Sequence, residues 1–127
     1  MCKEIIKSEQ APEPIGPYSQ AVKAGDFLFL SGQIALVPGT SALKTNSIAE
    51  ETQQVMENLK AVLAEAGAGF GNVVKTSIFL KDMNSFAEVN AEYGKYFEKD
   101  FPARETVAVR TLPKEVNVEI SMIAYIK

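Results

Sequence analysis

The chain of 127 residues contains no histidine and no tryptophan, and Cys2 is its single cysteine. Histidine is the side chain that most often carries protons near neutral pH. Its absence leaves that task to carboxylates, hydroxyls, backbone groups and guanidinium groups. A single cysteine cannot form an internal disulfide, and Cys2 has no neighbouring histidine or second cysteine with which to hold a structural zinc ion. The chemical repertoire of the chain is therefore small.

Clustered positive charge and long apolar runs are absent as well. The net charge is -3 and the isoelectric point is near 5.0. Because affinity for nucleic acid comes largely from clustered lysine and arginine, this dispersed charge argues against a nucleic-acid partner. No apolar run approaches the roughly 18 residues that span a bilayer, and the start of the chain lacks the apolar stretch of a signal peptide. We expect a single cytoplasmic domain over residues 1–127, with no membrane partner.

Periodic patterns divide the chain into strands and two helices. Strands are expected at residues 5–6, 19–24, 27–34, 73–80, 106–111 and 116–126. Ser47 has the position of a helix N-cap, and the apolar residues after it recur at helical spacing up to Gly67. A second helix is expected after a cap at Asp82 or Asn84, running through Phe97. Its buried stripe is predicted to contain Phe86, Val89, Tyr93 and Phe97.

This βββαβαββ order predicts an α+β fold with a six-stranded mixed sheet and both helices on one face. In the last strand the even-numbered residues should face the helices. The odd-numbered residues begin with Glu119 and become apolar at Ile123 and Tyr125. Two helices cover only one face of such a sheet, so we expect the other face to pack against sister chains.

Two charged residues lie in β-rich apolar stretches. Arg104 follows Pro102, which restricts the chain just before the guanidinium group. The planar fork of arginine matches a carboxylate, so Arg104 is a candidate anchor for a small acid; the alternative is an ordinary ion pair. Partial burial of Glu119 between Val118 and Ile120 would raise its pKa toward the range useful for moving protons to and from water. The alternative is a solvated strand face.

Other polar residues have two interpretations each. Ser31 and Gly32 end a strand, where they either bond a ligand or mark a bend. Tyr18 forms either the wall of a cleft or part of the core, and Asn90 either links loops or only belongs to the second helix. The sequence has no phosphate-binding loop, nucleophile elbow, nicotinamide fingerprint or metal-ligand cluster. We therefore expect neither a cofactor nor a metal.

Nine sequence blocks taken together resemble the Rid (YjgF/YER057c/UK114) family. They lie at residues 15–21, 31–33, 58–63 with 66–67, 74–75, 79–83, 86–90, 102–104, 112–113 and 118–120. The blocks occur in the order that this family shows and cover nearly the whole chain. The resemblance implies a chorismate-mutase-like fold, assembled as a homotrimer with clefts between subunits.

The resemblance also implies an activity, that of a 2-iminobutanoate/2-iminopropanoate deaminase. Such an enzyme hydrolyses reactive enamine and imine acids to 2-oxo acids and ammonia without a cofactor. Arg104 would clamp the substrate carboxylate, and Glu119 would orient water and transfer protons. The remaining residues expected to bind substrate are Tyr18, Ser31, Gly32, Asn90 and Thr106. Thr106 stands where many relatives have cysteine, Ser121 where an acidic residue is frequent, and Glu51 where glutamine is usual. These departures concern substrate preference and regulation.

Two other functions compete with this one. The first is a trimeric regulator that binds 2-oxo acids or amino acids through Arg104 without turning them over. The second, translation inhibition through RNA cleavage, is attached to some members of the family. The acidic balance and the missing histidine oppose it.

Overall fold

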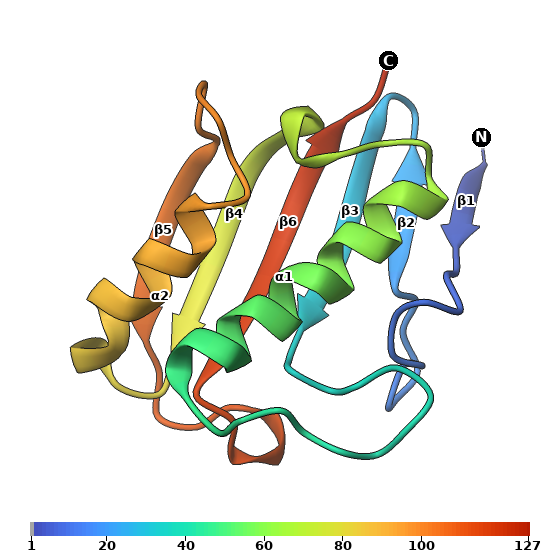
Figure 1. The fold of residues 1–127 in the computed structure, drawn as a ribbon. Helices are drawn as coiled ribbons and strands as arrows, with labels where there is room; N and C mark the ends of the chain where they lie inside the picture. The colour runs from blue at the N-terminus through green and yellow to red at the C-terminus, as the bar shows by residue number, and fades with distance from the viewer. Residues whose placement is uncertain (1) are drawn as a thin grey trace.

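Six strands form one mixed sheet in the order β1-β2-β3-β6-β4-β5, with both helices in front of it (Figure 1). The structure is a computed structural model and describes residues 2–127. The strands are β1 (Lys3–Ile6), β2 (Ala21–Ala24), β3 (Phe27–Gln33), β4 (Val73–Leu80), β5 (Ala103–Ala108) and β6 (Val118–Tyr125). Neighbouring strands are antiparallel except β4 and β5, which are parallel. The predicted mixed sheet and the single helical face are confirmed.

β1, β2, β3 and β6 differ from their predicted bounds by one or two residues at an end, and β5 differs by three residues at each end. Gly25 has a φ of 61°, which lets the chain turn between β2 and β3 as predicted. The bounds of β4 are those predicted. β5, however, begins at Ala103 and ends at Ala108 instead of spanning residues 106–111, because residues 103–108 pair in register with Lys75–Leu80 of β4. This pairing places Arg104 inside the strand.

The first helix, α1 (Ile48–Glu65), has the predicted ends. The Ser47 hydroxyl accepts a hydrogen bond from the Glu50 N–H at 3.1 Å, and the chain leaves the helix through Gly67, whose φ is 75°. Three short 3-10 turns accompany the regular elements: η1 (Phe70–Asn72), η2 (Met83–Ser85) and η3 (Pro113–Glu115). In residues 2–127, neither helix has the length and apolar character needed to cross a membrane.

The second helix, α2 (Phe86–Gly94), is shorter than predicted. Asp82 caps the preceding turn η2 by accepting a hydrogen bond from the Asn84 N–H. The helix ends at Gly94 and not at Phe97, whose ring instead packs against Phe70 with ring centres 5.4 Å apart. The prediction that Phe86 is buried was wrong, since 39% of this residue is exposed. It lies at the first position of α2, near β5.

The core fills the space between the helices and one face of the sheet. The alternation predicted for β6 is confirmed, because Val118, Ile120, Met122 and Ala124 are buried. The opposite sheet face is uncovered in the single chain. It presents Phe27, Phe29 and Tyr125, each more than 40% exposed, with the rings of Phe27 and Tyr125 in edge contact at 5.3 Å. We call this surface the open face.

Candidate functional site

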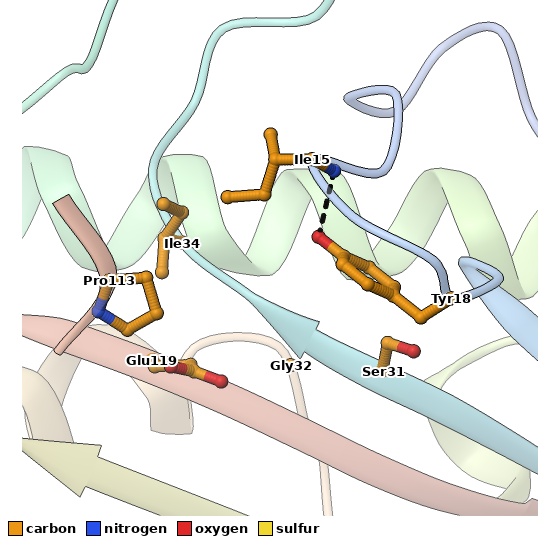
Figure 2. A pocket seen from close by; sticks show the side chains of 7 residues that line it. All are labelled: Ile15, Tyr18, Ser31, Gly32, Ile34, Pro113 and Glu119. Atoms are coloured by element: carbon orange, nitrogen blue, oxygen red, sulfur yellow. Dashed lines mark hydrogen bonds between the residues drawn. The ribbon is translucent and has the colours of Figure 1, made fainter.

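A hollow of about 300 Å³ opens beside the end of β3 (Figure 2). We call it the Glu119 pocket. It is lined by Ile15, Tyr18, Ser31, Gly32, Ile34, Pro113 and Glu119. These residues come from the proline-rich loop before β2, from the end of β3 and the residue after it, from η3 and from β6. The pocket therefore joins parts of the chain that are far apart in sequence.

A bulge in β3 shapes the floor of the pocket. The register between β3 and β6 shifts between Leu30 and Gln33, so that Ser31 and Gly32 lie at an irregularity in the ladder. The Ser31 hydroxyl donates to the Ser19 carbonyl oxygen at 2.6 Å, which fixes its rotamer. A Cβ atom at Gly32 would overlap the Glu119 carboxyl group. With glycine there, the carboxyl group can lie directly against the backbone.

Glu119 is half-buried at this bulge. Burial raises the pKa of its carboxyl group from the ordinary value of 4.5. The chain just before it is held by the buried carboxylate of Glu51, on the first turn of α1. That carboxylate accepts hydrogen bonds from the Asn117 N–H at 2.7 Å, the Asn117 side chain at 2.8 Å and the Val118 N–H at 3.0 Å. Sequence patterns did not indicate this role of Glu51, because the contact joins residues 66 positions apart.

The proline-rich loop that carries Tyr18 is ordered by internal hydrogen bonds. The buried Gln20 side chain donates to the carbonyl oxygens of Pro12 at 2.8 Å and Ser8 at 3.1 Å, and accepts from the Ser8 N–H at 2.6 Å. The Tyr18 hydroxyl accepts a hydrogen bond from the Ile15 N–H at 3.1 Å (Figure 2). Tyr18 is therefore a wall of the pocket rather than a core residue, and 47% of it is exposed.

A second hollow, of about 320 Å³, surrounds Arg104. The Arg104 Nη1 group donates to the Asn90 side-chain oxygen at 2.7 Å, and the guanidinium carbon lies 5.2 Å from the ring centre of Tyr93 and 5.7 Å from that of Phe86. Within residues 2–127, no acidic side chain lies within 4.0 Å of the guanidinium group. Arg104 is held by neutral groups alone, so its charge remains available to an anion.

Thr106 lies two residues farther along β5, on the same face as Arg104. Its hydroxyl oxygen is buried, and it has no hydrogen-bond partner among the residues that the structure describes. Buried hydroxyls normally have a partner, so this one is a candidate to contact a ligand beside the guanidinium group. We call the hollow around Arg104 with the adjoining Thr106 the Arg104 pocket.

The two pockets lie on opposite faces of the sheet. Arg104 is in register with Thr76 of β4, whose side chain is buried on the helix side. Glu119 is in register with Phe79 of β4, an odd number of residues away from Thr76. Side chains alternate between faces along a strand, so Arg104 faces the helices and Glu119 faces away from them. One copy of the chain therefore does not bring the two groups together.

The predicted site residues thus divide into two groups. Tyr18, Ser31, Gly32 and Glu119 line one pocket, Asn90 and Arg104 line the other, and Thr106 lies two residues beyond Arg104 on β5. Sequence reasoning missed the aromatic support of Arg104 by Phe86 and Tyr93, and the apolar wall of Ile15, Ile34 and Pro113. The spacing of residues within a helix or a strand gives no direct signal for contacts between them. Residues 2–127 contain no cluster of three or more acidic or cysteine side chains suited to a metal ion.

The architecture is that of a two-layer α+β protein, one layer a mixed sheet and the other a pair of helices. A family model described as Endoribonuclease L-PSP matches residues 8–126. The chain belongs to this family, which is also called the YjgF or Rid family.

Three relatives illustrate the family. The chain is 50% identical, over 98% of both chains, to a protein of Pyrococcus abyssi named "RutC family protein". It is 45% identical, over 98% of both chains, to a protein of Dermatophagoides farinae named "2-iminobutanoate/2-iminopropanoate deaminase". Among solved structures, E. coli TdcF with bound serine matches with a TM-score of 0.93 and 36% identity, covering 98% of this chain and 99% of TdcF.

Proposed function

We propose that this protein is a cofactor-free deaminase that hydrolyses small 2-imino acids, such as 2-iminopropanoate and 2-iminobutanoate, to 2-oxo acids and ammonia. The observation that carries the proposal is the state of Arg104. Its guanidinium group is positioned by an amide oxygen and two aromatic faces, and none of these partners neutralises it. A fixed, uncompensated guanidinium group suits the carboxylate of a small acid.

We propose further that the site is completed between copies of the chain in a homotrimer. The Arg104 pocket of one copy would meet the Glu119 pocket of the next. Two features support this arrangement: the two groups lie on opposite sheet faces of one chain, and the open face exposes aromatic residues. Exposed apolar surface of this kind is typical of an interface. β5 also ends the sheet, with one edge unpaired.

The reaction needs only groups found in the two pockets. Glu119, as a carboxylate, takes a proton from water while the water oxygen bonds to the imine carbon, and then gives this proton to the imine nitrogen. The carbon–nitrogen bond of the resulting tetrahedral species then breaks. In this step Glu119 takes the proton of the hydroxyl group and passes it to the amino nitrogen, so that ammonia leaves and the carbonyl of the 2-oxo acid remains. Ser31 and Gly32 line the same pocket as Glu119, and the Ser31 hydroxyl and the Gly32 backbone would bond polar groups on the reacting carbon.

The named relatives support this choice in different ways. The Dermatophagoides farinae protein bears the name of the proposed activity, and TdcF holds serine, an amino acid of the size that the proposed substrates have. The family description mentions an endoribonuclease. RNA cleavage is the weaker candidate for this chain, because its net charge is -3 and it lacks histidine.

A second candidate function is ligand sensing without turnover. The serine-bound TdcF structure favours it, since a relative there holds an amino acid. Both functions require Arg104, so its position alone does not separate them. Proton transfer by Glu119 is needed for turnover but not for sensing, so it separates the two functions.

The deciding experiment measures turnover. A serine dehydratase generates 2-aminoacrylate, which tautomerises to 2-iminopropanoate, and the release of pyruvate and ammonia is followed with and without the protein. We expect acceleration over the spontaneous rate. A rate equal to the spontaneous one, together with measurable binding of pyruvate or serine by calorimetry, would favour sensing.

A further inference from the structure

We infer that Ile15 is a partition that limits the length of the substrate side chain, by separating the Glu119 pocket from a second apolar hollow behind it. This inference rests on the proposed function, because it assigns a place to the side chain of a 2-imino acid. The second hollow has a volume of about 440 Å³, larger than the Glu119 pocket. We call it the rear hollow.

The two hollows lie side by side along one wall. Ile15 lines both of them. Two further segments contribute to each: Ile34 and Pro113 line the Glu119 pocket, while Leu36 and Lys114 line the rear hollow. Three separate parts of the chain therefore pass from one hollow to the other. Only Ile15 presents the same side chain to both.

The wall beside Ile15 suits an apolar group. Figure 2 shows Ile34 and Pro113 on one side of the pocket and Ser31 on the other. If the reacting carbon lies between Ser31 and Glu119, a substrate side chain directed away from these polar groups meets Ile15, Ile34 and Pro113. Aliphatic walls favour an alkyl group over a charged one.

The rear hollow continues this apolar character. Its lining includes Pro12, Pro14 and Leu36, with the charged residues Glu13 and Lys114 also present. Glu13 is paired with Lys7 at 3.6 Å. An aliphatic or aromatic side chain longer than ethyl would therefore find apolar contacts there once the partition is removed.

The partition is held in place although Ile15 is 54% exposed. The Tyr18 hydroxyl bonds the Ile15 N–H at 3.1 Å, and Pro14 restricts the backbone before it. On the opposite side, the buried Asn58 side chain of α1 donates to the carbonyl oxygens of Ile34 at 3.0 Å and Leu36 at 2.9 Å. Both sides of the boundary are thus fixed, and the size of residue 15 decides whether the hollows join.

The test compares a short and a long substrate in the variants Ile15→Ala and Ile15→Phe. An L-amino acid oxidase generates the imines from 2-aminobutyrate and from leucine, and their hydrolysis is measured against the spontaneous rate. We expect Ile15→Ala to raise the ratio of kcat/KM for the leucine imine over the 2-aminobutyrate imine about tenfold, because each methylene accommodated in an apolar pocket changes specificity by about that factor. Ile15→Phe should lower the ratio or leave it at the wild-type value.

Ile5→Ala is the matched control, since Ile5 on β1 is 53% exposed and lines neither hollow. A ratio that changes no more in Ile15→Ala than in Ile5→Ala would overturn the inference. A larger gain for the imine of glutamate than for that of leucine would overturn it too, because Lys114 rather than the apolar walls would then govern the hollow.

A binding measurement separates this inference from the proposed function. Calorimetry compares 2-oxobutanoate with 4-methyl-2-oxopentanoate in wild type and Ile15→Ala. If no imine is hydrolysed faster than spontaneously, the proposed function fails, yet the partition still predicts a gain of about tenfold in relative affinity for the longer 2-oxo acid. Equal relative affinities in both proteins would contradict the partition itself.

Discussion

The Arg104 pocket and the Glu119 pocket contain groups of opposite charge, and their surroundings affect those charges in opposite ways. Arg104 keeps its charge available because its neighbours are neutral, namely Asn90, Phe86 and Tyr93. Glu119 is pushed toward neutrality because half-burial raises its pKa. A binding group benefits from a permanent charge, whereas a proton-transferring group benefits from a charge that is easily lost. We therefore expect Arg104 to bind the substrate and Glu119 to transfer protons.

Removing each charged group in turn tests whether Arg104 and Glu119 have different roles. Arg104→Ala should lower kcat/KM for 2-iminopropanoate by about a thousandfold, because two charge-assisted hydrogen bonds to a carboxylate are lost. Glu119→Gln should lower kcat by a comparable factor and leave binding of 2-oxobutanoate intact. Steady-state kinetics and calorimetry check both. Equal loss of ligand binding in the two variants would erase the division of roles.

Mixing these two inactive variants tests whether the pockets meet between copies. When Arg104→Ala and Glu119→Gln chains are unfolded together and refolded at equal amounts, about a quarter of the interfaces should pair an intact Arg104 with an intact Glu119. Activity should return to about that share of the wild-type value. Variants refolded separately serve as the control. Absence of any recovery in co-assembled trimers would mean that each site lies within one chain.

Gly32→Ala should disturb the Glu119 pocket and leave the Arg104 pocket unchanged. A Cβ atom at this position overlaps the end of the Glu119 side chain, which can swing away. We expect kcat to fall about a hundredfold, because displacement of a reacting group by about an ångström costs that much. The melting temperature should change little. Unchanged kcat with a large drop in melting temperature would show that the glycine serves only the fold.

Phe86→Leu disturbs only the Arg104 pocket. The change removes one aromatic face from the guanidinium group, so KM should rise about threefold, as expected for a partly exposed cation–π contact. The value of kcat should stay near that of wild type. Phe86→Tyr keeps the ring and should keep the KM. An unchanged KM in Phe86→Leu would mean that Asn90 and Tyr93 suffice to hold Arg104.

The smallest expected effect concerns stability and pH. Because the folded-state pKa of Glu119 is raised above 4.5, ionisation is less favourable in the folded chain than in the unfolded one. Wild type should lose stability relative to Glu119→Gln as the pH rises from about 4.5 through the raised folded-state pKa of Glu119. Melting temperatures at pH 4 and pH 7 check the sign. A melting temperature of wild type that rises relative to that of the variant between pH 4 and pH 7 would contradict a raised pKa of Glu119.

Sequence patterns predicted some elements well because their signals are local. Ser47 and Gly67 bound α1 through groups within one turn of the helix ends, and β4 is rich in β-branched and aromatic residues. Phe86 was misplaced because helical spacing does not say that α2 starts near the sheet edge. The start of β5 was missed because it depends on pairing with Lys75 and Thr76, which are 28 residues away.

Residue type and short spacing alone specify the caps of α1, the alternation of β6 and the kinds of groups available for chemistry. The position of Arg104 and Glu119 on opposite faces of the sheet emerges only in the folded chain. That outcome depends on how β5 and β6 are registered against β4, and a shift of one residue in either strand would move every side chain to the other face. Long-range backbone pairing sets that register, and no local pattern encodes it.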